Sequence, residues 1–366
     1  MPPSPRVCVA RMSAYIPGEA GSPRAVKLNQ NENPYPPSPA AAPAAAAAMA
    51  RMGRYPDSRS TPLRRAAAET YGAPEACVMA FNGSDELLRL LFETFVDPGG
   101  AIVMFNPGYT YYRTLADMHG AETRLVELTD DYALPPAADI ARALAGAKLL
   151  FITNPNAPSG TAFPEAELLE LCGMFPDGIV CVDEAYADFY GETLIPRVAE
   201  RGNLVVARTF SKGYGLAGLR VGLGFAPPEL AAAMEKVRDY YNLDVLAQAA
   251  AAAALRDQAY LRTTVGKIVK TRDRLSRALA ELGFRVWPSS ANFVLARHPG
   301  GTEAARALFE ALRRREVLVR YFTAPRLADC LRITVGTDAE NDCLLARLEE
   351  LTAGCSPLKN GLGPGT

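Results

Sequence analysis

Short, almost wholly apolar runs alternate with amphipathic segments over the first two thirds of the chain. The apolar runs are typical of strands buried on both faces of a parallel sheet, and apolar residues at a 3.6-residue period predict helices. The predicted strands are 77–81, 101–105, 123–127, 148–153, 178–183, 204–209 and 219–225. The predicted helices are 39–53, 60–71, 86–96, 111–119 and 165–175, with Thr61 as the N-cap of the second. This alternation predicts a three-layer α/β domain in which helices cover a mostly parallel sheet.

The pattern changes after about residue 228. A long helical region to residue 282 is followed by shorter segments, which are strands at 284–287 and 293–296, a helix at 302–315, extended stretches at 317–320 and 330–335, and a helix at 338–353. These segments predict a smaller α+β domain. The predicted division is an N-terminal arm (1–33) that joins the small domain, a large domain (34–240), the small domain (241–355) and a disordered tail (356–366) rich in Gly and Pro.

Composition and charge exclude several classes of function. Charged residues make up 22% of the chain and the formal net charge is −1, so no global field attracts nucleic acid or a membrane, and we expect neither as a partner. Two histidines argue against a metal site. Seven cysteines without a C-x-x-C pair, and no leader-like apolar segment at the N-terminus, favour a cytoplasmic protein.

Four groups of polar residues fall in order within the predicted α/β domain. Asp183-Glu184-Ala185-Tyr186 ends one strand, and Thr209-Phe210-Ser211-Lys212 follows the next. Arg220 lies eight residues after Lys212, and Gly83-Ser84-Asp85 precedes a helix. Each group alone is more often a cap, a turn or a solvated surface charge. Because ligands bind at the carboxyl ends of parallel strands, together these groups predict one shared site.

Pyridoxal 5'-phosphate (PLP) is the ligand that needs this combination of side chains. Its aldehyde forms a Schiff base with a lysine such as Lys212. A carboxylate such as Asp183 keeps the pyridine nitrogen protonated. A tyrosine hydroxyl suits the 3-hydroxyl, and an arginine with the amides of a helix N-terminus suits the phosphate.

The chain resembles fold type I PLP-dependent aminotransferases, and among them the histidinol-phosphate aminotransferases. The most specific match is Arg-Thr-Phe-Ser-Lys-Gly-Tyr-Gly-Leu-Ala-Gly-Leu-Arg-Val-Gly at 208–222. The resemblance covers about residues 28 to 335, through stretches at 28–34, 54–57, 82–86, 107–109, 154–160, 183–186, 208–222 and 331–334.

The resemblance implies a role for each matching residue. Lys212 carries PLP and moves the proton, Asp183 pairs with the ring nitrogen, and Tyr186 bonds the 3-hydroxyl. The remaining cofactor contacts are Gly83, Ser84, Asp85, Thr209, Ser211 and Arg220 at the phosphate, Tyr109 stacked on the ring, and Tyr55 from the partner subunit of a homodimer with shared active sites. Arg332, Arg320 and Asn33 are the expected substrate contacts.

One position departs from the family pattern Asn-Pro-Asn-Asn-Pro-Thr-Gly. The chain has Ala157 where the family has the asparagine that bonds the 3-hydroxyl. Alanine has no hydrogen-bonding side chain, so this contact falls to Asn156, to Asn154, or to Tyr186 alone.

The first expectation for function is transamination between histidinol phosphate and 2-oxoglutarate, a step of histidine biosynthesis. Two alternatives use the same scaffold: an aromatic amino-acid aminotransferase and a threonine-phosphate decarboxylase. A non-catalytic PLP-binding protein is the alternative from another class. It is disfavoured because too few residues precede the first motif to form a DNA-binding module.

Overall fold

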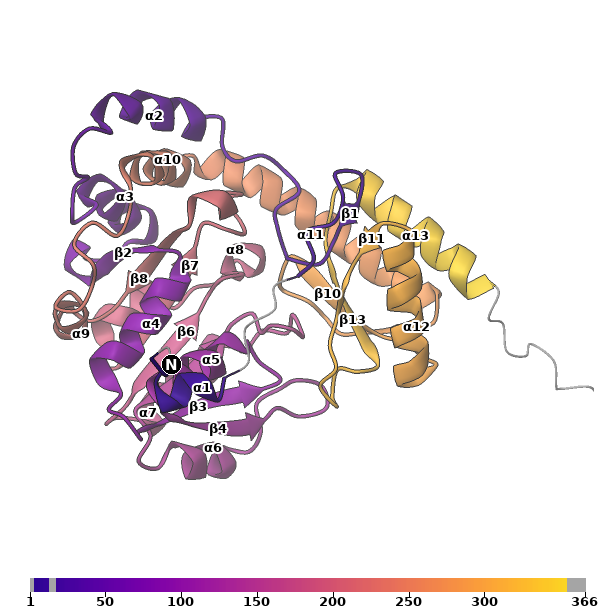
Figure 1. Cartoon of the computed structure of the whole chain (residues 1–366), viewed down its shortest axis with the longest axis horizontal. Coiled ribbons are helices and arrows are strands. Elements are labelled where there is room, and N and C mark those ends of the chain that lie inside the picture. The colour runs from indigo at the N-terminus through magenta and orange to yellow at the C-terminus, as the bar shows by residue number, and fades with distance from the viewer. Residues whose placement is uncertain (1–2, 13–17, 354–366) are drawn as a thin grey trace, which may run out of the picture. The chain divides into compact units, whose positions relative to one another are not determined.

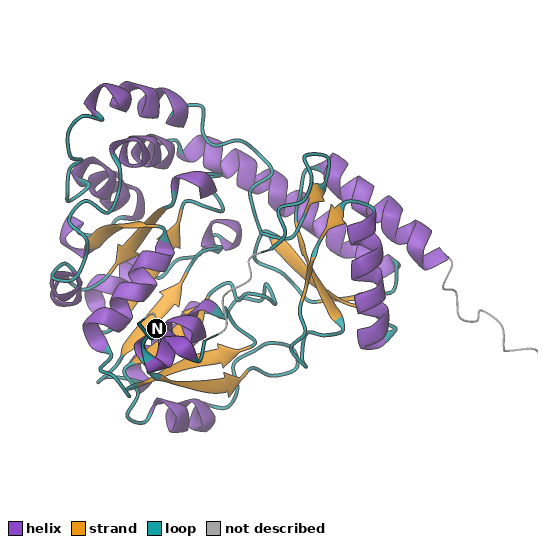
Figure 2. Cartoon of the chain, viewed as in Figure 1, coloured by secondary structure: helices purple, strands orange, loops and turns teal. Residues whose placement is uncertain are grey.

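The computed structural model describes residues 3–12 and 18–353 (Figure 1). The chain forms two compact units. The first contains Glu32–Lys267, Pro288–Asn292 and the described part of residues 1–17, and the second contains Gly18–Asn31, Ile268–Trp287 and the chain from Phe293 onward. In both units helices flank the strands (Figure 2).

A seven-stranded sheet forms the centre of the first unit. Its strands, in spatial order, are β2 (Val78–Asn82), β8 (Val221–Phe225), β7 (Leu204–Thr209), β6 (Ile179–Asp183), β5 (Leu149–Thr153), β3 (Ala101–Asn106) and β4 (Glu122–Glu127). The strands from β7 to β4 are parallel to their neighbours, whereas β8 is antiparallel to both β7 and β2. The predicted α/β fold with a mostly parallel sheet is confirmed.

Apolar side chains cover both faces of this sheet, as the apolar runs predict. Alternate strand residues, including Phe151 and Val205, form one core with α4 (Ser84–Phe95), α5 (Tyr111–His119) and α9 (Pro228–Met234). Residues of the opposite phase, such as Ile152 and Val206, are fully buried as well. The other helices of this unit are α1 (Val7–Ala10), α2 (Ala41–Ala48), α3 (Thr61–Tyr71), α6 (Ala137–Leu144), α7 (Glu165–Met174), α8 (Ala187–Tyr190) and α10 (Val245–Arg256), with 3-10 turns at Met49–Arg51, Glu75–Cys77, Ile195–Glu200 and Ala217–Leu219.

The second unit is a small α+β structure. Its antiparallel sheet has the order β12 (Arg320–Tyr321), β13 (Cys330–Thr334), β10 (Phe293–Arg297) and β9 (Arg285–Val286). A second, parallel pair joins β1 (Val26–Lys27) to β11 (Val317–Leu318). Helices α12 (Gly301–Arg314) and α13 (Asp338–Ala353) belong to this unit, and α11 (Gln258–Glu281) contains the boundary after Lys267.

The division of the chain differs from the predicted boundaries at 33 and 240. Helix α10 belongs to the first unit because it packs against α2 and α3. Residues 18–31 belong to the second unit because β1 pairs with β11, and the Thr334 amide donates to the Leu28 carbonyl. The described residues before Met12 group with the first unit instead, where α1 contacts α5. The predicted tail at 356–366 lies outside the described residues.

Candidate active site

The predicted convergence of Asp183 and Lys212 follows from strand order. Strands β6 and β7 are parallel neighbours, and Asp183 is in register with Ala207. Asp183 ends β6, and Lys212 lies in the turn that follows β7. Both residues therefore stand at the carboxyl edge of the sheet, where open parallel sheets bind ligands.

Asp183 is a buried carboxylate held by uncharged donors. It is 3% exposed, and it accepts hydrogen bonds from the Tyr112 hydroxyl (2.9 Å) and the Ala185 amide (3.1 Å). No basic side chain pairs with it among the residues that the structure describes. Burial therefore raises the pKa of Asp183 to about 6. Such a group favours a cationic ligand atom.

Tyr112 is a site residue that the sequence reasoning missed. Its hydroxyl bridges Thr153 (2.8 Å) and Asp183 (2.9 Å), and its ring meets that of Tyr109 edge-on, with centroids 5.4 Å apart. The sequence feature that could have indicated Tyr112 is its place three residues after Tyr109, on the apolar face of a predicted helix. Tyr186, just before α8, is also buried, at 8% exposed.

The N-terminus of α4 packs closely against the backbone of β8. Gly83 has φ +76°, which glycine adopts without strain, and Ser84 opens the helix. A Cβ at Gly222 on β8 would lie 2.5 Å from the Ser84 nitrogen. The close approach of the two backbones explains the glycine at 222, and the positive φ explains the glycine at 83. A helix N-terminus of this kind favours anions.

A guanidinium faces this helix N-terminus. Arg220 Nη2 lies 3.2 Å from the Asp85 carboxylate, and Nη1 donates to Ser211 Oγ at 3.3 Å. The Thr209 hydroxyl accepts from the Ser211 amide at 3.1 Å. Burial raises the pKa of Asp85, against the charges of Arg220 and Lys212 and a hydrogen bond from Tyr109. All six residues predicted for the phosphate therefore belong to this one cluster: Gly83, Ser84, Asp85, Thr209, Ser211 and Arg220.

Asn33 lies beside the turn that carries Lys212. Its side-chain amide donates to the backbone carbonyls of Lys212 and Gly213, each at 2.9 Å, and its Oδ1 accepts from the Tyr35 amide. Both amide hydrogens are thus used to hold the lysine turn. The predicted contact of Asn33 with the substrate stays a prediction.

The loop around Ala157 uses both candidate asparagines internally. Asn156 donates to Ser159 Oγ (2.8 Å) and to the Pro107 carbonyl (3.3 Å). Asn154 pairs through its amide with the backbone of Phe163. These contacts hold the loop and occupy the side-chain amide group of each asparagine.

Arg332 and Arg320 lie on neighbouring strands of the second unit. They are paired directly across β13 and β12. Both guanidinium groups lie 5.6 Å from the ring centroid of Phe322, and Arg332 also donates to the Asn29 carbonyl at 3.1 Å. Like charges opposite one another destabilise a sheet, and an anion bound there would offset that repulsion.

Tyr55 stands on an exposed apolar surface. It is 81% exposed and stacks on Tyr241 with ring centroids 4.5 Å apart. Exposed apolar side chains also occur at Met49 and Met52, shortly before Tyr55, and at Val237 and Tyr240, shortly before Tyr241. We call these six residues the aromatic patch.

The raised pKa of Asp183 predicts a pH-dependent stability of the cofactor-free protein. The folded carboxyl holds its proton more tightly than the unfolded one, whose pKa is 3.8. The stability that the bound proton adds to the folded state is present at low pH and is lost as the pH rises through about 6. We expect the free energy of unfolding of wild type, relative to Asp183→Asn, to fall by about 2–3 kcal/mol between about pH 4 and pH 7.5. Urea unfolding measures it, and equal pH dependence in both proteins would contradict it.

Comparisons with known proteins agree with this geometry. Residues 23–348 match the family model for aminotransferase class I and II. A histidinol-phosphate aminotransferase of Geotalea daltonii is 45% identical over 94% of this chain and 98% of its own, and one of Geotalea uraniireducens is 47% identical with the same coverage. The crystal structure of histidinol-phosphate aminotransferase from Sinorhizobium meliloti in complex with pyridoxal-5'-phosphate has a TM-score of 0.88 at 28% identity, covering 96% of this chain and 98% of its own. The chain belongs to the class I and II aminotransferase family.

Proposed function

We propose that the protein is a PLP-dependent aminotransferase that converts histidinol phosphate and 2-oxoglutarate to imidazole acetol phosphate and glutamate. The observation that carries the proposal is Asp183, a buried carboxylate without a basic partner in the described chain, on the strand next to the one that leads to Lys212. The histidinol-phosphate aminotransferases that cover nearly the whole chain support the choice of substrate.

The described residues fit PLP in charge and shape. Asp183 suits the protonated ring nitrogen, and the α4 N-terminus with Arg220 suits the phosphate. We propose that Tyr109 stacks on the ring and that Tyr186 bonds the 3-hydroxyl. Bound PLP supplies an electron sink for the carbanion at the substrate α-carbon.

Lys212 is the residue that attaches the cofactor and moves the proton at the substrate α-carbon. A free lysine has a pKa of about 10.4 and is a poor base at neutral pH, because its amine is protonated. Nearby positive charges disfavour the protonated form and so make a lysine a better base. Arg220 supplies one within the same cluster. Asn33 holds the lysine turn through two carbonyls, so that the amine is presented from a fixed backbone.

Arg332 and Arg320 are proposed to bind the anionic group of the substrate. Replacing Arg332 with alanine is expected to raise the KM for histidinol phosphate by ~10–100-fold, the value of a charged hydrogen bond. The affinity for PLP should change little. The exposed Arg314→Ala is the control, and steady-state kinetics with a PLP titration measure both quantities. An unchanged KM would show that another residue holds the anion.

We also propose a homodimer with shared active sites, in which the aromatic patch is the contact surface. Exposed apolar side chains mark interaction surfaces, and Tyr55, which stacks on Tyr241, would then contact the PLP phosphate of the partner. The six described cysteines are free thiols, which supports a reducing cytoplasm as the place of action. None of the helices in the described residues is long and apolar enough to cross a membrane.

Subunit mixing tests the shared site. Tyr55→Ala and Lys212→Ala subunits are each expected to form poorly active dimers. A mixed dimer rebuilds one complete site, so random reassociation should restore about a quarter of wild-type activity. Mixing Lys212→Ala with a second lysine variant of the same position, Lys212→Met, is the control and should restore none. Failure of the first mixture, with exchange shown by native mass spectrometry, would place Tyr55 outside the partner's site.

A substrate panel tests the proposed reaction. Histidinol phosphate, phenylalanine, tyrosine and threonine phosphate are each supplied with 2-oxoglutarate, and glutamate and carbon dioxide are measured. We expect the highest kcat/KM for histidinol phosphate with no carbon dioxide. A preference for phenylalanine or tyrosine would identify an aromatic aminotransferase. Release of carbon dioxide from threonine phosphate would identify a decarboxylase.

A further inference from the structure

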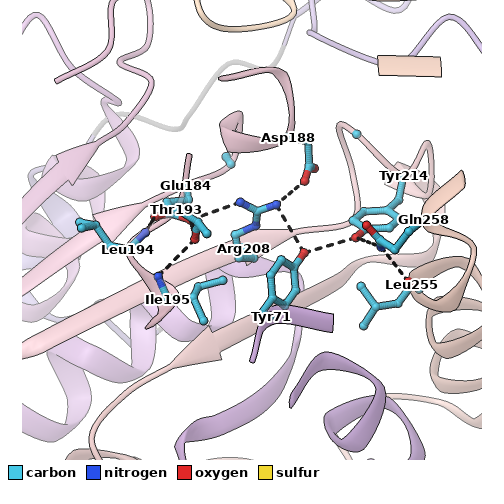
Figure 3. A network of polar contacts seen from close by, with 12 residues as sticks. Tyr71, Glu184, Asp188, Thr193, Leu194, Ile195, Arg208, Tyr214, Leu255 and Gln258 are labelled. Carbon is cyan, nitrogen blue, oxygen red and sulfur yellow. Dashed lines mark hydrogen bonds and ion pairs between the residues drawn. The ribbon is translucent and has the colours of Figure 1, made fainter. Parts of the chain in front are cut away.

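We propose that Arg208 is a positioning residue that fixes the turn carrying Lys212 relative to Asp183. Arg208 lies on β7, one residue before the phosphate-site residue Thr209, and it is 5% exposed. No hydrogen bond or ion pair joins Arg208 directly to Asp183 or to Lys212. Its contacts reach the chain beside both of them (Figure 3). The inference rests on the proposed role of Lys212 as the residue that attaches PLP.

On one side, Arg208 holds the chain that follows Asp183. Its Nη1 lies 3.2 Å from Oε2 of Glu184, the residue after Asp183. The same carboxylate accepts from the Thr193 hydroxyl and the Leu194 amide, each at 2.6 Å. Glu184 is 3% exposed. The Arg208 guanidinium therefore joins β7 to the residue that follows β6, whose carboxylate is held by two further hydrogen bonds.

On the other side, Arg208 acts through Asp188 on the lysine turn. Its Nη2 pairs with Asp188 Oδ1 on α8. The Asp188 carboxylate lies against Gly213, the residue after Lys212, so closely that a Cβ at Gly213 would overlap it. Gly213 is not one of the described glycines with a positive φ, so its backbone conformation does not require glycine. The close contact with Asp188 does.

The two tyrosines of the network complete the support of this turn. Arg208 Nη2 donates to the Tyr71 hydroxyl at 3.4 Å, and the Tyr71 and Tyr214 hydroxyls are 3.3 Å apart. Gln258 donates to the Tyr214 hydroxyl at 3.1 Å. Tyr214 is two residues beyond Lys212, so the turn is held at Gly213 and again at Tyr214. Figure 3 shows these groups around the single guanidinium.

Only an arginine can make this set of contacts. The planar guanidinium presents fixed donors in several directions, whereas a lysine ammonium is a compact point charge on a flexible stem. The side chains of Arg208, Glu184 and Asp188 are all 3–6% exposed, so water cannot replace a missing donor. Replacing the guanidinium by an ammonium should keep the charge while loosening the geometry at Lys212.

Arg208→Lys is the variant that tests the proposal. The matched control is Arg197→Lys, because Arg197 makes an ion pair with Glu165 at a half-exposed position in the same unit. Three quantities are measured: the Tm of cofactor-free protein, the rate at which added PLP becomes attached to Lys212 (trapped with borohydride), and kcat and KM. A purely structural role would change only the Tm.

We expect Arg208→Lys to slow PLP attachment at least ~10-fold and to lower kcat ~100-fold, the scale of a misplacement of about 1 Å. KM should stay within about threefold of wild type, since Arg208 touches no substrate. The control should match wild type in all three quantities. Attachment and kcat at the level of the control, in folded Arg208→Lys protein, would overturn the proposal.

Gly213→Ala decides the matter if Arg208→Lys does not fold. The added methyl group would overlap the Asp188 carboxylate, so the contact between Asp188 and the lysine turn must shift, while no side chain of the network is itself replaced. The proposal expects slowed attachment and lowered kcat, and wild-type attachment in this variant would overturn it. If wild type itself attaches no PLP, the proposed function fails. If wild type and both variants attach it equally fast, only the role of Arg208 fails.

Discussion

Replacing Lys212 with alanine is expected to lower the rate of transamination by ~10⁴-fold or more. The lysine is both the point of attachment for PLP and the base that moves the proton at the substrate α-carbon, and loss of a general base alone costs up to ~10⁴-fold. The Asp183 carboxylate and the Arg220 cluster remain, so the variant should still bind PLP without a covalent bond. Single-turnover kinetics with histidinol phosphate measure the loss.

The exposed Lys236 offers a control for this experiment. Lys236→Ala removes the same charge from the same unit and should keep wild-type turnover and covalently attached PLP. Turnover of Lys212→Ala near the level of Lys236→Ala would show that a different group performs the chemistry.

Replacing Asp183 with asparagine is expected to have the second largest effect, a fall in kcat of ~10²–10³-fold. Asparagine keeps the shape and the hydrogen bond with Tyr112 but has no charge to stabilise a protonated ring nitrogen. Removal of one buried, preorganised electrostatic group from an active site has losses of this size. The KM for histidinol phosphate should change much less than kcat.

Asp177→Asn is the matched control, because Asp177 is exposed just before β6 and lies at the opposite end of that strand from Asp183. It should keep the wild-type kcat. A kcat for Asp183→Asn within a factor of about three of this control would remove Asp183 from the catalytic machinery.

The sequence predicted the sheet well because most of its strands are buried on both faces. The run 204–209 begins with four consecutive apolar residues before Arg208 and Thr209, a pattern without a helical period, and β7 has these bounds. The helix at 111–119, ended by Gly120, was also predicted with its observed bounds, since Gly120 adopts the left-handed C-cap. The strand order, with β8 antiparallel, depends on long-range pairing that no local pattern contains.

Helix starts were predicted less well, for local reasons. Helix α4 begins at Ser84, two residues before the predicted start, because polar residues in its first turn resemble a loop. The predicted cap Thr61 is instead the first residue of α3. Its amide donates to the Asp57 carboxylate at 2.8 Å, and Ser60 makes no side-chain cap. A cap four residues upstream is outside the usual N-cap pattern.

In the site, the residues with conspicuous chemistry were predictable and their supports were not. Lys212, Asp183 and Arg220 stand out in the sequence as charged residues beside apolar strands. Tyr112 and Arg208 look like core or edge residues in the sequence, and their roles appear only when neighbouring strands bring the partners together. Asn33 was assigned to the substrate by its place in a motif, and no local pattern indicates the hydrogen bonds that it makes with the Lys212 turn.

Reductive trapping tests the central claim, that Lys212 carries PLP, most directly. The purified protein is incubated with PLP, reduced with borohydride, digested and mapped by mass spectrometry. We expect one phosphopyridoxyl group per chain, on the peptide that contains Lys212, and loss of the visible absorbance band on reduction. A modification at another lysine, or no visible band and no modification after saturation with PLP, would contradict it.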